Sequence, residues 1–334
     1  MGLNIRDIVP RKEIEFSNLK GRVIAVDAFN AIYQFLSTIR QYDGTPLMDK
    51  SGKISSHLSG LFYRNTALLT EGIKLIYVFD GKPPEMKKET NEKRSENKLI
   101  AREKFEEARS KEDYEAMKRY SSQLTKIDED IIKESKDILE ALGIMAVQAP
   151  GEGEAQASYM AKLKDIYAVA SQDYDCLLFG SPLLIQNLTL ARTRKTPSGS
   201  VEIKPEVIEL ERVLNYLQIN HDQLICLGIL VGTDYNPGGV KGIGQKKALD
   251  LVRKRKTPVG IFNQFPDLDF DWKEIFEMFK KPDIEKGIKI KFPAPDFGKV
   301  KEILISRDFS PERIDKQIEK LKEVESKSRQ KTLF

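Results

Sequence analysis

Acidic side chains follow several apolar runs of this chain, at positions where a fold would bring them together. RVIAVD ends at Asp27, IKLIYVFD ends at Asp80, and IYAVASQDYD carries Asp173 and Asp175. In an open α/β sheet, ligands bind outside the carboxyl ends of the strands, so carboxylates placed there should converge. One such aspartate is commonly a helix N-cap or a turn residue. Aspartates from three different strands favour a shared site instead.

Three further acids extend this set. Glu152 and Glu154, in PGEGEAQASYMAKL, stand at the start of a predicted helix, where they would also suit the helix dipole. Asp234, in VGTDYNPGG, follows another apolar run. So many carboxylates cannot lie together unless cations neutralise them. Because carboxylate oxygens favour hard ions, we expect two Mg²⁺ ions, which Mn²⁺ replaces, and two-metal hydrolysis of a phosphodiester.

The composition narrows the class of protein. Only two histidines are present, His57 and His221, so imidazole catalysis is poorly supplied. Cys176 and Cys226 lie in apolar surroundings and are expected to be buried thiols of a reducing compartment. The N-terminus lacks a signal-peptide pattern, and the longest apolar stretch, from Leu224 to Gly232, is too short to span a bilayer. We therefore expect an intracellular soluble protein without a membrane partner.

The sequence around the acids predicts an α/β fold. Short apolar runs alternate with helix-period segments, which predicts a mostly parallel central sheet with helices on both faces. A fourth strand-like run, PLLIQNLTL, begins at Pro182. The segment 85–134 is densely charged and contains no glycine, so it predicts one or two exposed helices inserted into the α/β body.

The region 236–252 predicts a helix-hairpin-helix element. In GVKGIGQKKA the glycines allow close backbone approach, and the helix that follows aims N–H groups at a phosphate. From Pro237 to Lys256 there are seven basic residues and one acid. This local basic patch is hidden in the small net charge of +4. Such contacts position duplex DNA without reading its sequence.

Several strings of the chain resemble flap endonucleases of the 5′-nuclease superfamily, of the archaeal type. The similarity runs from Gly2 to about Gln330, and VFDGKPP and QDYDCLLFG are together its most specific part. The supporting strings are AVDAFNAIYQFL, SSHLSGLFYRN, YVFDGKPPEMKKET, KRSE, APGEGEAQASYMA, ASQDYDCLLFGSP, VGTDYNPGGVKGIGQKKAL and SKSRQ. The resemblance implies a PIN-like 5′-nuclease fold. It also implies cleavage of 5′ flaps in Okazaki fragment maturation and DNA repair, with 5′–3′ exonuclease activity.

The resemblance also implies a division of the chain. A single nuclease domain is expected over 1–326, with an N-terminal region over 1–100, a helical gateway over 85–134 and an internal region over 140–260. Residues 327–334 would form a C-terminal tail that resembles a clamp-binding segment.

Roles of individual residues follow from the same resemblance. The acids that match the metal ligands of the family are Asp27, Asp80, Glu152, Glu154, Asp173, Asp175 and Asp234. Lys87 and Arg94, in the gateway, match cations that stabilise the scissile phosphate. The residues implied in DNA binding are Tyr33, Arg40, Arg64, Gly242, Gly244, Lys246 and Lys247. Val240 and Ile243 match carbonyl ligands of a monovalent cation such as K⁺, and the free amino end at Gly2 is implied to lie near the active centre.

The end of the chain departs from the family pattern. Relatives commonly end in a box that binds the sliding clamp PCNA, with a glutamine, an aliphatic residue and paired aromatics. Here Gln330 is followed by KTLF, so Leu333 and Phe334 are the matching residues and one aromatic is missing. Clamp binding through the tail is expected, together with a monomeric free protein. The expected location is the archaeal cytoplasm, at the nucleoid, or the nucleus of a eukaryote.

Other functions remain open on the sequence. A relative specialised as a 5′-exonuclease or as a junction-resolving enzyme would carry the same acids. A phosphatase with a nucleophilic aspartate could place Asp173-Tyr174-Asp175 at a strand end, but it leaves the helix-hairpin-helix unexplained. A catalytically inactive DNA-binding scaffold would use the basic hairpin without needing every acid.

Overall fold

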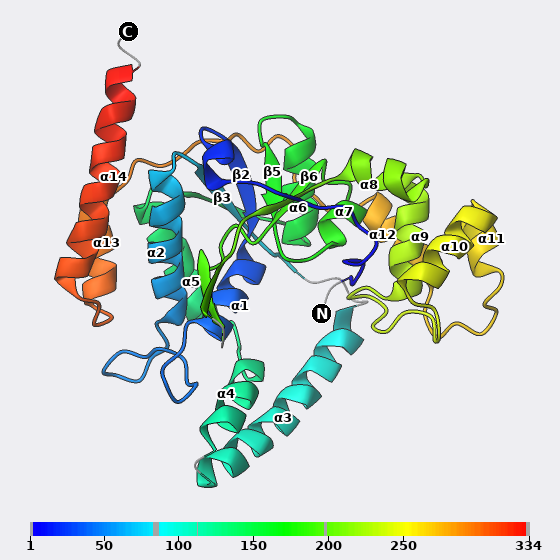
Figure 1. The fold of residues 1–334 in the computed structure, drawn as a ribbon, viewed down its shortest axis with the longest axis horizontal. Helices are drawn as coiled ribbons and strands as arrows, with labels where there is room; N and C mark the ends of the chain where they lie inside the picture. Colours follow the sequence, from blue (N-terminus) through cyan, green and yellow to red (C-terminus); the bar gives the residue numbers. More distant parts are fainter. Residues whose placement is uncertain (1–2, 83–86, 112, 197–198, 332–334) are drawn as a thin grey trace.

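The centre of the computed structural model is a seven-stranded sheet with the order β1-β9-β6-β5-β2-β3-β4 (Figure 1). The structure describes residues 3–82, 87–111, 113–196 and 199–331. The strands of the sheet are β1 (Lys12–Glu13), β2 (Val23–Asp27), β3 (Lys74–Phe79), β4 (Met145–Gln148), β5 (Ala168–Ala170), β6 (Leu183–Gln186) and β9 (Glu206–Glu209). The five strands from β6 to β4 run parallel, whereas β9 and β1 are antiparallel to their neighbours. The predicted mostly parallel sheet is confirmed.

Helices cover both faces of this sheet, because its parallel strands are apolar on both sides. In β3, Leu75, Tyr77 and Phe79 belong to one buried core, and Ile76 and Val78 belong to the other. The first core is closed by α1 (Ala28–Thr38), α2 (Ser56–Thr70), α5 (Glu129–Ala141), α13 (Phe297–Ile305) and α14 (Pro311–Lys331). The second is closed by α6 (Gly153–Lys162), α7 (Asp175–Leu178), α8 (Leu210–Leu217), α9 (His221–Val231), α10 (Gln245–Arg255), α11 (Pro258–Phe262) and α12 (Trp272–Lys280).

Two helices, α3 (Lys88–Ser110) and α4 (Tyr114–Gln123), project from this body and pack against each other (Figure 1). They are the two exposed helices expected in the charged insertion. The gateway is hereafter the helix pair α3 and α4. The predicted span 85–134 extends beyond it, because residues 129–134 lie in α5, which packs on α2 in the body. Asp128 caps that helix and marks the return to the body.

Other boundaries differ from those expected. The strand β5 has only three residues, so Asp173 and Asp175 lie beyond its end, and Asp175 begins α7. A second, two-stranded sheet of β7 (Thr193–Thr196) and β8 (Gly199–Glu202) was not anticipated. The polar end expected to be a tail continues as helix α14 to Lys331, and residues 332–334 lie outside the described part. A short 3₁₀ helix, η1, spans Phe16–Leu19. Among the described residues, no helix is both long and apolar enough to cross a membrane.

Candidate active site

Two neighbouring parallel strands, β2 and β3, each deliver one aspartate to the same edge of the sheet. Asp27 is the last residue of β2, and its Oδ1 accepts the N–H of Asn30 at 3.0 Å, which caps α1. Asp80 follows β3, and its Oδ1 accepts the N–H of Gly153 at 2.7 Å. Both carboxylates therefore accept a backbone hydrogen bond, Asp27 from its own helix start and Asp80 from the start of α6.

Helix α6 brings the two glutamates to this edge. Glu152 immediately precedes the helix, and Glu154 lies in its first turn. The glycine between them is required by the close packing: a Cβ on Gly153 would lie 2.7 Å from Asp80 Oδ1 and 3.0 Å from the carbonyl oxygen of Val78. The sequence EGE at this point therefore lets two acids flank a backbone that touches a third.

A serine that the sequence reasoning missed connects the acids. Ser171 Oγ donates to Glu154 Oε1 at 2.9 Å, lies 3.3 Å from Asp27 Oδ2 and accepts the N–H of Asp173 at 3.1 Å. The thiol of Cys176 lies 3.5 Å from the same Glu154 oxygen. Ser171 directly follows β5, two residues before Asp173. This place after a buried strand was the only feature of the sequence that could have indicated a role for Ser171 in the site.

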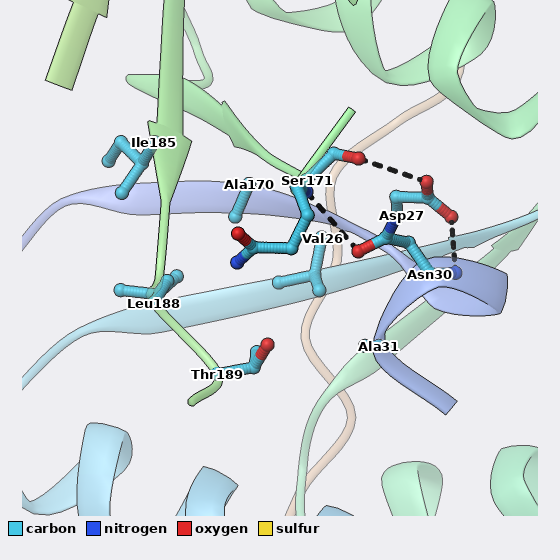
Figure 2. A pocket seen from close by; sticks show the side chains of 10 residues that line it. Val26, Asp27, Asn30, Ala31, Ala170, Ser171, Ile185, Leu188 and Thr189 are labelled. Atoms are coloured by element: carbon cyan, nitrogen blue, oxygen red, sulfur yellow. Dashed lines mark hydrogen bonds between the residues drawn. The ribbon is translucent and has the colours of Figure 1, made fainter. Parts of the chain in front are cut away.

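The small pocket in Figure 2 lies beside Asp27, between α1 and the ends of β2, β5 and β6. Asp27 holds hydrogen bonds to Asn30 and Ser171 there, and Asn30 Oδ1 accepts the N–H of Gln172 at 3.2 Å. These bonds fix the first turn of α1 against the end of β5. The pocket is lined by Val26, Asp27, Asn30, Ala31, Ala170, Ser171, Gln172, Ile185, Leu188 and Thr189.

Burial and mutual repulsion raise the pKa values of several acids of the site. Burial, together with the negative charges of Asp27 and Glu152, raises the pKa of Asp80 to about 7. Burial and then the charge of Asp27 raise the pKa of Glu154 well above its ordinary value. Burial also raises the pKa of Asp175, whose Oδ1 accepts the N–H of Leu3 at 3.4 Å. Each carboxylate is thus costly to ionise unless a cation is near.

Among the described residues, the side chain of Lys87 reaches the acids. Lys87 Nζ lies 2.7 Å from Glu152 Oε2 and 3.7 Å from Asp234 Oδ2, and its side chain is only 14% exposed. The ammonium also lies 5.7 Å from the centre of the Tyr235 ring. Burial lowers the pKa of Lys87, but the adjacent Glu152 and the charge of Asp234 outweigh burial and raise it. Lys87 is therefore charged and acts as counter-ion within the site.

Taken as they stand, no three His, Cys, Asp or Glu side chains in the described ranges converge closely enough to hold a metal ion. The chemistry of the donor set nevertheless fits hard divalent cations. All candidate ligands are carboxylates, and when they are ionised their mutual repulsion is relieved by positive charge. The predicted metal ligands stay a prediction.

The predicted DNA contacts fall in separate places. Tyr33 projects from α1 and is 45% exposed, which leaves its ring available for stacking. Arg64 is half-buried on α2. Arg40 points into the protein, where its guanidinium donates to Ser121 and Thr125. Arg94 lies in α3, but its side chain is outside the described part, as are Gly2, Leu333, Phe334 and the side chain of Gln330.

The predicted hairpin joins α9 to α10. Gly242 has φ +80°, in the region that favours glycine, and Gly244 stands at the N-cap of α10. Val240 accepts the N–H of Ile243 at 3.0 Å, which closes the turn. The side chains of Lys246 and Lys247 are exposed at the start of α10. Their charges and the free N–H groups of a helix start suit a phosphate backbone.

Comparison with known proteins places the chain in a family. The XPG N-terminal domain matches residues 4–101, and the XPG I-region matches residues 143–234. The chain is 51% identical to flap endonuclease 1 of Thermococcus onnurineus, over 100% of this chain and 98% of that protein. It is 52% identical to flap endonuclease 1 of Pyrococcus furiosus, with the same coverage. The solved structure of flap endonuclease-1 from Methanococcus jannaschii superposes with a TM-score of 0.78 at 40% identity, covering 98% of this chain and 100% of that one. This chain belongs to the flap endonuclease 1 family.

Proposed function

We propose that this protein is a structure-specific endonuclease that cuts 5′ flaps of branched DNA at the junction between single strand and duplex. The observation that carries the proposal is the gathering of acids from β2, β3, α6 and the end of β5 at one edge of the sheet, with a charged lysine among them. Relatives that bear the name flap endonuclease 1 share about half of the sequence over its full length. The reaction would leave a 5′ phosphate and a 3′ hydroxyl. It would serve replication and repair, with 5′–3′ exonuclease action on suitable ends.

The acids are proposed to hold two Mg²⁺ ions, which Mn²⁺ would replace. The proposed ligands are Asp27, Asp80, Glu152, Glu154, Asp173, Asp175 and Asp234. When bound, the ions supply Lewis acidity at the phosphodiester and lower the pKa of water. The hydrogen bond from Ser171 orients Glu154 in this arrangement, and the backbone N–H groups of Gly153 and Asn30 orient Asp80 and Asp27.

Other residues are proposed to position the DNA and to stabilise charge. Lys87, held beside the acids, would stabilise the negative charge that develops on the scissile phosphate, with Arg94 as its partner from the gateway. The exposed ring of Tyr33 would stack a base at the cleavage position, which contributes roughly 1–3 kcal/mol. Because none of these contacts reads a base edge, recognition should depend on DNA shape and strand ends.

The hairpin between α9 and α10 is proposed to hold the duplex away from the site. Lys246 and Lys247 would bind phosphates, and the backbone at Gly242 and Gly244 would approach the strand closely. The carbonyls of Val240 and Ile243 are proposed to hold K⁺ at the same hairpin. Arg64 is proposed as a further phosphate contact.

The proposed cellular setting follows the family. The end of the chain would bind the sliding clamp PCNA through Gln330, Leu333 and Phe334, and the free protein would be a monomer. Its place of action would be the nucleoid in the cytoplasm of an archaeon. The proposed nuclease domain is 1–326, and 327–334 is the clamp-binding segment, of which α14 already includes the part to Lys331.

The test is single-turnover cleavage of a 5′-labelled double-flap DNA in Mg²⁺ or in EDTA, beside a blunt duplex and a 3′ flap. One Mg²⁺-dependent product at the flap junction, with both controls intact, is expected. A ladder from the blunt end would identify an exonuclease instead. Tight binding without cutting would identify a scaffold, and release of phosphate from small esters would identify a phosphatase.

A further inference from the structure

The side chain of Arg40 connects three segments of the chain through hydrogen bonds. It follows α1, and its Nε donates to the carbonyl oxygen of Ser37 at 2.9 Å. One Nη1 bond reaches the carbonyl oxygen of Gly44 at 2.8 Å, and the other reaches Ser121 Oγ. Nη2 donates to Thr125 Oγ1 at 2.9 Å. The planar guanidinium therefore links the end of α1, the turn that follows it and the end of α4.

The side-chain partners of Arg40 are buried. Ser121, in the last turn of α4, is 4% exposed and donates to the carbonyl oxygen of Gly44 at 2.7 Å. Thr125, just beyond α4, is 7% exposed. The turn itself is closed by a bond from the N–H of Gln41 to the carbonyl oxygen of Thr45 at 2.8 Å. Movement of α4 against α1 would thus break bonds among buried polar groups, which is costly.

Most N–H donors of the Arg40 guanidinium are used within the protein. A guanidinium has five N–H donors and no acceptor. Four are used by Ser37, Gly44, Ser121 and Thr125, so at most one is left for a phosphate. The bidentate phosphate contact for which arginine is suited would need two.

We propose that Arg40 is a positioning residue, which fixes the base of the gateway to the helix that carries Asp27 and Tyr33. Helix α1 begins at the Asp27 cap, presents Tyr33, and ends next to Arg40. The position of α4 is thereby set relative to the acids through one rigid helix. At the other end of the gateway, Lys87 precedes α3 and forms an ion pair with Glu152 of the site. This inference deepens the proposed function, since the gateway that Arg40 holds would place catalytic cations over the scissile phosphate.

The discriminating variant is Arg40→Lys, because lysine keeps the positive charge but lacks the planar set of five N–H donors of the guanidinium. If Arg40 acts through Ser121 and Thr125, single-turnover cleavage of the double-flap DNA should fall about ten- to a hundred-fold, as expected of a misplaced catalytic element. Flap affinity and its dependence on salt should stay as in the wild type. The pair Ser121→Ala and Thr125→Val should reproduce the loss, and adding Arg40→Lys to the pair should change little more.

A matched control and a readout without DNA complete the test. Lys247→Ala, which removes a proposed phosphate contact, should lower the salt slope of binding by about one. Arg40→Lys should speed amide hydrogen exchange in α4 and leave exchange in α2 unchanged. If Arg40→Lys shows faster exchange in α4 but the wild type does not cut flaps, the positioning role of Arg40 would be supported and the proposed function would be overturned. Wild-type cleavage by Arg40→Lys, a salt slope that falls as in Lys247→Ala, or unaltered cutting by the Ser121 and Thr125 variants would overturn the role of Arg40.

Discussion

Asp27 and Asp80 each accept a backbone hydrogen bond at the end of a buried strand while lying among other acids. The ordinary reading of such an aspartate as a cap is therefore correct for Asp27, and it does not exclude a role in the site. The cap bond turns the carboxylate to a fixed orientation, which leaves the second oxygen directed toward neighbours such as Ser171. One carboxylate oxygen of Asp27 thus caps α1, and the other accepts from Ser171 in the candidate site.

Asp173 allows a direct test of the carboxylate site. Asp173→Asn removes one charge while keeping the shape, so flap cutting should fall by about a thousand-fold or more, because metal stabilisation is worth several kcal/mol. DNA affinity should remain near that of the wild type. Asp165→Asn, an exposed acid just before the same strand, is the control and should cut normally. Equal losses of binding and cutting in Asp173→Asn would contradict the assignment.

Replacing Lys87 with alanine is predicted to strengthen metal binding and to slow cutting. Lys87→Ala removes the counter-ion of Glu152 and Asp234, so Mn²⁺ should bind the DNA-free protein more tightly, as titration calorimetry would measure. Cutting should nevertheless fall about a hundred-fold, because a cation at the scissile phosphate is lost.

Lys82→Ala, an exposed lysine five residues earlier, is the matched control for Lys87 and should change neither quantity. Weaker Mn²⁺ binding by Lys87→Ala than by the wild type would rule out its role as a competing cation.

At the scale of elements, helices and strands could be predicted from the sequence wherever burial or exposure imposes a pattern of apolar and charged residues. The runs ending at Asp27 and Asp80 are strands because they are apolar on both faces, and the charged insertion is a pair of projecting helices. Side-chain hydrogen bonds carry no such pattern. Ser171 beneath Glu154 and the inward turn of Arg40 were therefore not predicted. The pairing of β7 with β8 was also missed, since the residues of β8 are exposed and follow no apolar pattern.

The hairpin before α10 gives a prediction at this scale. Lys246→Ala combined with Lys247→Ala should weaken binding to duplex DNA of any sequence to the same extent, because phosphate contacts carry no sequence information. The slope of log affinity against log salt should fall by about two. Fluorescence anisotropy with two unrelated duplexes at several salt concentrations would measure both. A loss confined to one of the duplexes would show base reading instead.

The whole molecule should respond to pH through its acids. Burial and the charges of Asp27 and Glu152 raise the pKa of Asp80 from 3.8 to about 7, and the pKa values of Glu154 and Asp175 are raised as well. Between these values the folded protein binds more protons than the unfolded chain, so stability falls as pH rises. The metal-free protein should therefore have its highest Tm below the raised pKa values and lose stability up to about pH 7.

Thermal unfolding in EDTA from about pH 5 to about pH 8 would measure this fall. Asp80→Asn cannot ionise and should show a shallower decline, which makes it the control. Adding Mg²⁺ should restore stability most at the higher pH, where the carboxylates are charged. A Tm that rises with pH in EDTA would be incompatible with a cluster of raised pKa values.

The first described residues have a practical bearing on how the protein is handled. Leu3 is buried, Ile5 is fully buried, and the N–H of Leu3 bonds to Asp175 inside the acidic site. Any affinity tag or reporter fused ahead of Leu3 would start its path next to the reacting centre. Helix α14 instead carries the opposite end of the chain away from the sheet (Figure 1). Purification handles and surface-immobilisation linkers therefore belong after α14, and scars left by N-terminal cleavage would be expected to slow the enzyme.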